Sequence, residues 1–152
     1  MKGTYTIVVR CNDAGYSTFG KLGRARLRKG HYLYTGSALG RGAVSLEGRL
    51  ERHLRRKKRL RWHVDYLASR PDCDVTGALY VVSGSRLECK VNSAISKALD
   101  ISPVLSKIGA SDCKCNGHLL GPVRGLNERY LMRRLKLVYA QFGVPQSCIV
   151  NV

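Results

Sequence analysis

Runs of apolar and β-branched residues mark the strands that this chain is predicted to form. Residues 4–10 are a β-branched apolar run and predict a strand. Residues 31–35 predict a second strand that ends at a glycine. Residues 75–82 are apolar almost throughout and predict a buried strand, which a Ser-Gly-Ser turn follows. Repeated glycines between residues 12 and 30 favour turns and short strands, one of them at residues 24–27.

Elsewhere the apolar residues recur at helical spacing. Leucines between residues 46 and 54 lie on one stripe and predict a helix. Residues 62–69 predict a short second helix before a proline, and apolar positions from 87 to 98 predict a third. Residues 127–142 predict a final helix, which an asparagine caps. Residues 103–125 show no regular period and are expected to be irregular.

These elements predict an α+β fold or a three-layer sandwich, because helices must cover one small sheet. We expect a mixed or antiparallel central sheet flanked by helices, with an extra helix near the C-terminus. A chain of 152 residues suits one domain. Residues 1–125 are expected to form its main part, with an insertion near residues 12–30, and residues 126–152 a helix and tail packed on it. No membrane span or leader sequence is apparent, so we expect a cytoplasmic protein.

The net charge adds a partner to this picture. The chain has 27 Lys and Arg against 10 Asp and Glu, a formal charge of +17. Such an excess attracts polyanions, which predicts a nucleic acid partner and makes an anionic membrane the weaker alternative. Eight of the thirteen residues from Arg49 to Arg61 are basic. The expected contacts to nucleic acid are Arg52, Arg55, Arg56, Lys57, Lys58, Arg59 and Arg61.

The six cysteines leave two interpretations open. An even number suggests disulfides in a secreted chain, whereas the missing leader sequence favours reduced thiols unless the source is a hyperthermophile. Cys113, Cys115 and His118 offer two thiolates and an imidazole to a metal. However, we see no fourth ligand nearby, and the Cys-x-Cys spacing is tighter than most zinc sites use. The pattern therefore disfavours zinc.

Two tyrosines and a basic helix carry the most informative chemistry. Tyr5 lies two positions after a glycine, and Tyr34 lies two positions before one. Arg49 and His53 are four residues apart, which places both on one face of the predicted helix. Two phenols, a guanidinium and an imidazole in one positive pocket are suited to cutting a phosphodiester.

The order of these residues resembles the GIY-YIG nuclease domain. Within that superfamily the chain is most similar to a small, functionally uncharacterised branch known mainly from archaea and bacteria. The motifs that carry the resemblance are Gly3-x-Tyr5, Gly30-x-Tyr32-x-Tyr34-x-Gly36-Ser37-Ala38, Arg49-x-x-Arg52-His53-Leu54, Trp62-His63-x-Asp65-Tyr66-Leu67, Glu88-Cys89 and Ser111-Asp112-Cys113-x-Cys115-x-x-His118-Leu119. They span residues 3 to 120 and are specific in combination.

The resemblance implies a mixed sheet packed by helices and hydrolysis of a phosphodiester with one divalent metal. Tyr5 and Tyr34 correspond to the motif tyrosines, one of which would deprotonate or orient the attacking water. Arg49 corresponds to the helix arginine that stabilises the charge of the transition state. A phenol has a pKa near 10 in water, so a basic role requires Arg49 and the metal to lower it.

The resemblance also assigns the remaining positions of the expected site. His53 would assist proton transfer, and His63 would be a further polar residue beside the substrate. Glu88 corresponds to the carboxylate that holds one Mg²⁺ or Mn²⁺, since a hard cation prefers oxygen ligands and keeps several waters.

Three functions follow from these considerations. The leading hypothesis is a metal-dependent endonuclease, with DNA favoured over RNA as its substrate. A second is a catalytically inactive GIY-YIG-fold module that binds DNA or RNA. A third is an RNA-associated protein stabilised by a metal at Cys113, Cys115 and His118.

Each candidate residue also has a structural interpretation. Tyr5 and Tyr34 suit strands in any protein, and Arg49 and His53 suit a solvated basic face. Glu88, in the first turn of a helix, complements the helix dipole. The nuclease hypothesis therefore depends on whether the fold gathers both tyrosines and Glu88 at one electropositive pocket.

Overall fold

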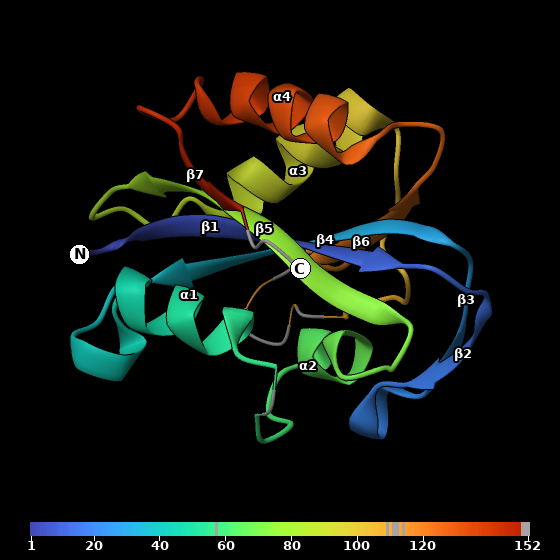
Figure 1. Cartoon of the computed structure of the whole chain (residues 1–152). Coiled ribbons are helices and arrows are strands. Elements are labelled where there is room, and N and C mark those ends of the chain that lie inside the picture. The colour runs from blue at the N-terminus through green and yellow to red at the C-terminus, as the bar shows by residue number, and fades with distance from the viewer. Residues whose placement is uncertain (57, 109, 111–112, 114, 150–152) are drawn as a thin grey trace.

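A five-stranded antiparallel sheet lies at the centre of the described part of the chain (Figure 1). The computed structural model describes residues 1–56, 58–108, 110, 113 and 115–149. The strand order is β6-β4-β1-β5-β7, and every neighbouring pair is antiparallel. The strands are β1 (Gly3–Cys11), β4 (Gly30–Ala38), β5 (Cys73–Val82), β6 (Leu119–Val123) and β7 (Gln146–Ile149).

Four helices of the described residues cover the two faces of this sheet, which confirms the predicted α+β class. The helices α1 (Leu46–Leu54) and α2 (His63–Ala68) lie on one face, and α3 (Glu88–Leu99) and α4 (Glu128–Tyr139) lie on the other (Figure 1). The described residues also form two short 3₁₀ turns, η1 (Gly20–Leu22) and η2 (Gly42–Val44). The protein therefore has three layers.

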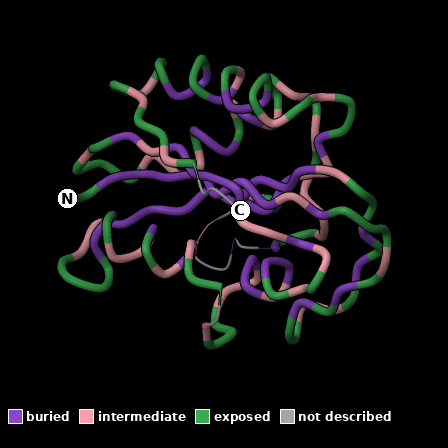
Figure 2. The backbone as a smooth tube through the Cα atoms, in the orientation of Figure 1, coloured by how far each residue is buried: buried purple, intermediate pink, exposed green. Residues whose placement is uncertain are grey.

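The strand β1 is buried on both sides because it lies in the middle of the sheet (Figure 2). Its residues alternate between the two cores: Tyr5, Ile7 and Val9 pack toward α1 and α2, and Val8 packs toward α3 and α4. A strand that is covered on both faces needs apolar residues at nearly every position. This explains the continuous apolar run that predicted the strand.

Side-chain caps define where two helices begin. The hydroxyl of Ser45 accepts a hydrogen bond from the backbone N–H of Gly48 at the start of α1. Asn127 caps α4 as predicted, since its side chain accepts a hydrogen bond from the N–H of Tyr130. The predicted end of this helix at Phe142 is wrong, because α4 ends at Tyr139.

The predicted insertion contains a two-stranded ribbon of β2 (Gly15–Thr18) and β3 (Arg24–Leu27). Two edge strands of the main sheet were not predicted. The strand β6 contains Pro122, a residue that argues against a strand, and β7 is mostly exposed and has no apolar run. The expectation that residues 103–125 are irregular is therefore wrong for β6.

The described residues of the C-terminal segment contact the sheet and α3. The helix α4 packs beside α3, and β7 pairs with β5. Cys11 and Cys73 form a disulfide at opposite positions of β1 and β5, whereas the other four cysteines are free thiols. None of the helices in the described residues has the length and apolar character needed to cross a bilayer.

Candidate functional site

The strand register brings the two motif tyrosines to the same face of the sheet. Tyr5 lies opposite Gly36 and Ile7 lies opposite Tyr34, so the two phenols are diagonal neighbours across β1 and β4. Their ring centroids are 6.4 Å apart. The two strands pair directly although the sequence between them holds the β2–β3 ribbon.

The motif glycine of β4 is required by the tyrosine opposite to it. A Cβ atom at Gly36 would lie 2.7 Å from the hydroxyl of Tyr5, closer than real Cβ contacts. Gly3 is also crowded, but by the backbone carbonyl of Val81 in β5 and by the side chain of Leu46. The two motif glycines therefore allow close packing against different neighbours.

The helix α1 delivers His53 and Arg49 to these phenols, one turn apart as predicted. His53 Nε2 lies 3.1 Å from the hydroxyl of Tyr5, and its ring is 5.7 Å from the ring of Tyr34. Arg49 donates a hydrogen bond of 2.9 Å to the carbonyl of Ser37 at the end of β4. Its guanidinium also lies 5.1 Å above the ring of Trp62, which precedes α2.

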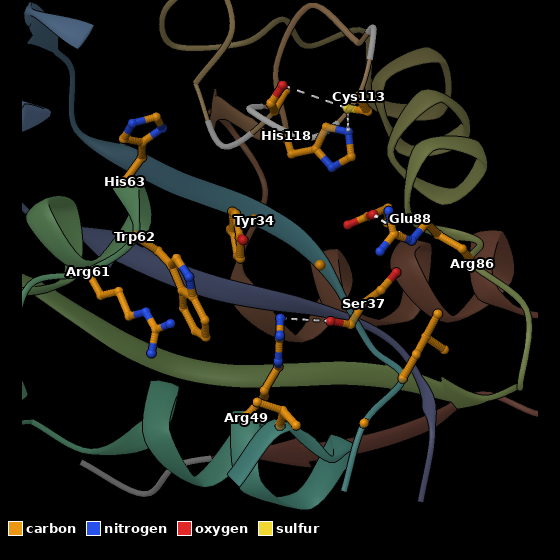
Figure 3. A pocket seen from close by; sticks show the side chains of 15 residues that line it. Tyr34, Ser37, Arg49, Arg61, Trp62, His63, Arg86, Glu88, Cys113 and His118 are labelled. Carbon is orange, nitrogen blue, oxygen red and sulfur yellow. Dashed lines mark hydrogen bonds and ion pairs between the residues drawn. The ribbon is translucent and has the colours of Figure 1, made fainter. Parts of the chain in front are cut away.

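A pocket of about 560 Å³ opens beside these residues. We call it the β4 pocket; its polar lining includes Tyr34, Arg49, Arg61, His63, Arg86 and Glu88. Figure 3 shows Glu88 and Arg86 of the α3 side facing the pocket from the side opposite Arg61 and His63. The sequence hypothesis required Glu88 to share a pocket with the tyrosines, and Glu88 and Tyr34 do so.

The geometry of the sheet edge explains how helices from both faces reach one pocket. The last pair between β4 and β6 is Tyr34 with Leu119, and the N–H of Thr35 then donates to the carbonyl of His118. Residues 36–38 of β4 extend past the end of β6. At this uncovered end of β4, Glu88, the first residue of α3, lines the same pocket as Tyr34.

Tyr5 does not face the β4 pocket. It is fully buried beneath it, where burial raises its pKa to about 12 despite the lowering effect of Arg49. Burial also raises the pKa of Tyr34, which keeps 8% of its surface exposed and lines the pocket. Arg49 acts in the lowering direction on both phenols, as a basic role requires, but without a metal ion the penalty of burying a phenolate is larger.

His53 is held neutral between the aromatic rings. Burial lowers its pKa to about 3, so the imidazole carries no charge near pH 7. Its ring lies 5.0 Å from the ring of Trp62. A neutral imidazole can accept the hydroxyl proton of Tyr5 in a hydrogen bond, and it orients this tyrosine rather than the contents of the pocket.

Two polar atoms at the pocket have no hydrogen-bond partner among the described residues. These are Nε of Arg49 and the hydroxyl of Ser37, both buried. Buried polar groups are normally paired, so each of these two atoms needs an explanation, such as an ordered water molecule or a bound ion. Glu88 lies 3.7 Å from Arg86, an ion pair that a cation or a phosphate could rearrange.

The basic residues at the end of α1 and in the segment that follows are only partly available to a ligand. Arg52 forms a bidentate salt bridge, with N···O distances of 2.8 and 3.1 Å, to Asp65, which is fully buried. Arg56 pairs with Asp74, and Lys58 donates to the carbonyl of His53. The more exposed basic residues of this segment include Arg55, Arg59 and Arg61, and Arg61 lines the pocket. Lys57 lies outside the described residues.

Sequence reasoning gave no role to Asp65, Trp62 or Arg86. Asp65 also accepts hydrogen bonds from the backbone N–H groups of Arg61 and Trp62. Burial would raise its pKa, but these bonds and the Arg52 guanidinium hold it below the ordinary value. Its place in the Trp62-His63-x-Asp65 motif was the sequence signal that could have identified it.

A second group of side chains, of the types that bind metal ions, lies next to the pocket. Cys89, Cys113, Cys115 and His118 place one ligand atom each within 4.8 Å of one another. The conclusion that the last three lack a fourth ligand is therefore wrong. Cys89 was missed because it is distant in sequence and lies in the first turn of α3.

The fold and site define a class: a three-layer α+β protein with an arginine-rich pocket at the open edge of an antiparallel sheet. Residues 4–136 match the family described as "Domain of unknown function DUF123", and the chain belongs to this family. No protein of curated function and no solved structure matches the chain.

Proposed function

We propose that this protein is a metal-dependent endonuclease of the GIY-YIG type. The observation that carries the proposal is that Tyr34, Arg49, His63 and Glu88, from four different elements, line one pocket. A phenol, a guanidinium, an imidazole and a carboxylate are the groups that positioning, charge stabilisation, proton transfer and cation binding require at a phosphodiester.

The charge of the molecule supports nucleic acid as the substrate. The formal charge is +17, and Arg49, Arg61 and Arg86 line the pocket together. An arginine guanidinium matches two phosphate oxygens at once, which favours a phosphate at this position. The proposed substrate is DNA rather than RNA, and the proposed compartment is the cytoplasm.

Arg49 is the residue that we expect to bind the scissile phosphate. The carbonyl of Ser37 and the ring of Trp62 hold its guanidinium in place, while its Nε stays unpaired. A donor that is positioned before the reaction stabilises developing charge without reorganising.

Tyr34 acts in this proposal through its hydroxyl in the neutral form. Its pKa is raised by burial, so at pH 7 it donates or accepts a hydrogen bond and orients a water molecule. Tyr5 and His53 lie below it and hold the aromatic cluster in position. His63, from α2, lines the pocket as His118 does, and His63 is the residue that we propose for proton transfer.

Glu88 is the proposed ligand for Mg²⁺ or Mn²⁺. It is the acidic residue among the described residues that line the pocket, and hard cations of this kind use one or two carboxylates together with water and phosphate. The residues present fit this mode of binding. When bound, the cation would polarise the phosphate and lower the pKa of a water molecule.

A catalytically inactive module that binds nucleic acid is the second candidate. The observation that favours it is the raised pKa of both phenols, together with the complete burial of Tyr5. Such a module would keep the arginines and the fold, and it would need neither Glu88 nor a divalent cation.

Cleavage of labelled branched and linear DNA and RNA, with and without Mg²⁺ or Mn²⁺, separates the two candidates. We expect metal-dependent nicking of DNA that falls about 10²–10³-fold in Arg49→Ala, because one preorganised donor at the transition state is lost. Glu88→Gln should lose the metal-dependent activity and keep its affinity for DNA. Tyr34→Phe should keep the fold and lower the rate.

Arg129→Ala is a matched control, because Arg129 is an exposed arginine of α4 on the other face of the sheet. It should cleave like the wild type. Salt-dependent binding without cleavage of any substrate would refute the nuclease proposal and support the binding module.

A further inference from the structure

The Cys3His cluster consists of Cys89, Cys113, Cys115 and His118. From its geometry we propose that it binds one zinc ion as a closed structural site. This ion would join the first turn of α3 to the segment that precedes β6, and so hold one wall of the β4 pocket in place.

The distances in the cluster match those between ligands of tetrahedral zinc. His118 Nε2 lies 3.4 Å from Cys113 Sγ and 3.7 Å from Cys89 Sγ. Bonds of about 2.3 Å to sulfur and about 2.0 Å to nitrogen place two tetrahedral ligand atoms about 3.6 Å apart. All four ligand atoms lie within 4.8 Å of one another, so a small contraction closes the site.

The imidazole is oriented as a zinc ligand requires. His118 Nδ1 lies 3.1 Å from the carbonyl of Thr35, an acceptor, so this nitrogen carries the proton. The lone pair of Nε2 then points at the two thiols. A backbone carbonyl that binds the second nitrogen is the usual partner of a metal-binding histidine. His118 is also buried, which holds the ring in this position.

The donor set selects zinc rather than the cation proposed at Glu88. Three thiolates and an imidazole are soft or borderline ligands, whereas Mg²⁺ requires oxygen. Four protein ligands leave no open position, which is typical of structural zinc and not of catalytic zinc. The two metal sites would therefore be adjacent and chemically distinct.

The segment from residue 100 to 118 explains why such a site is needed. Its described residues form turns and isolated bridges, such as Pro103 with Leu120, and no helix or strand. Connections longer than about 12–15 residues without secondary structure are uncommon in compact domains. A metal that closes a long loop stabilises it by removing freedom from the unfolded chain.

The position of the cluster links it to the pocket. Cys89 follows Glu88 directly, and Cys113 and His118 line the β4 pocket themselves (Figure 3). The side chain of Asn92 in α3 also donates to the carbonyl of Gly117. Removal of zinc would release this wall, while α1 and Arg49 on the other side would stay packed.

Metal analysis of the full chain, purified without chelators and after reconstitution with Zn²⁺, tests the site. We expect one zinc per chain, and cobalt in its place should show the thiolate charge-transfer bands of a tetrahedral site. Cys115→Ser should lose stoichiometric zinc. Cys148→Ser is the matched control, because Cys148 is a half-buried free thiol of β7 and is not one of the four ligands.

A second measurement does not depend on the folding of a variant. Chelation of the wild-type protein should lower its unfolding temperature by more than about 5 °C, since a ligand bound only by the folded state stabilises it. Amide exchange should rise in residues 100–118 and in the first turn of α3, but not in α1. Wild-type protein that retains no zinc after reconstitution overturns the proposal, as do four ligand variants that all bind zinc like the wild type.

This inference is independent of the proposed nuclease function. Zinc retention without any cleavage would leave the structural site standing and remove the nuclease proposal. Magnesium-dependent cleavage by a chain that never binds zinc would do the reverse.

Discussion

The two faces of the sheet are held by different chemistry. The face toward α3 and α4 is packed by aliphatic side chains such as Leu79 and Leu135, around a chain of hydroxyls from Tyr139 through Thr6 to Thr35. The face toward α1 and α2 buries an imidazole and a carboxylate among its aromatic rings. The α3/α4 face combines aliphatic packing with uncharged hydroxyls, whereas the α1/α2 face buries an imidazole and a charged carboxylate that need polar partners.

This difference predicts how substitutions on each face affect stability. On an apolar face, the loss of unfolding free energy depends on the size of the cavity that the substitution leaves, whereas removing the partner of a buried charge is strongly destabilising. Substitutions on the two faces should therefore differ in their effect on unfolding and on DNA binding.

Asp65→Ala should be the most destabilising single change on the α1/α2 face. It leaves the Arg52 guanidinium without its buried partner, which costs about 3–5 kcal/mol in the free energy of unfolding. Urea unfolding followed by circular dichroism measures this loss. Asp74→Ala is the control: Asp74 is partly exposed and pairs with Arg56, so the loss should stay below about 1 kcal/mol. Equal losses would contradict the contrast.

Leu135→Ala should create a cavity on the α3/α4 face and cost about 3 kcal/mol, because Leu135 is fully buried. The affinity of the folded variant for DNA should not change. Leu137→Ala, two positions along the same helix and 66% exposed, should change the free energy of unfolding by less than about 0.5 kcal/mol. A weakened affinity in Leu135→Ala would mean that the two faces are coupled.

His53 should make the α1/α2 face sensitive to acid. Its pKa is about 3 when folded and about 6.5 when unfolded, so the folded state binds fewer protons and loses stability as the pH falls below 6.5. This contribution is complete above pH 6.5 and falls by about 1.4 kcal/mol per pH unit down to the folded pKa. Measuring the unfolding free energy of the wild type and of His53→Gln between pH 7 and 4 gives its slope against pH for each protein. Equal slopes would refute the lowered pKa of His53.

Tyr139→Phe removes the outer hydroxyl of the chain on the α3/α4 face. Its oxygen lies 2.6 Å from the Thr6 hydroxyl, and Thr6 keeps its bond of 2.8 Å to Thr35. We therefore expect a loss of about 1 kcal/mol. Tyr130→Phe, on the exposed side of the same helix, should show no change in thermal unfolding.

Arg61→Ala should have the smallest effect, and only on binding. Arg61 is exposed and lines the β4 pocket, so the slope of log affinity for DNA against log salt should fall by about 1. Arg133→Ala removes an exposed arginine from α4 and should leave the slope unchanged. If both variants lower the slope equally, the binding surface is not confined to the pocket side.

Much of the fold follows from local patterns in the chain. The apolar run at residues 4–10 predicted β1, and the leucines of residues 46–54 predicted α1. In both segments the spacing of apolar residues over a few positions is enough to distinguish a strand from a helix. The strands β6 and β7 were missed because an edge strand gains its stability from the neighbouring strand and needs little apolar character of its own.

The candidate site divides in the same way. Arg49 and His53 were predicted on one helix face, because four residues make one turn. The contact between Cys89 and His118 had no local signal, because the two residues are 29 positions apart and only tertiary packing brings them together. The raised pKa of Tyr5 was also unpredictable, because burial depends on what packs over the ring.

The class of fold, the strong positive charge and the residue types of the pocket can be read from the chain alone. Periodicity, composition and short motifs are local properties that do not depend on how the chain folds in space. Tertiary packing is needed to show that Tyr34 lines the pocket while Tyr5 lies beneath it, that Asp65 pairs with Arg52, and that Cys89 is the fourth member of the Cys3His cluster. Burial and long-range contact decide these points, and both depend on how distant segments pack against each other.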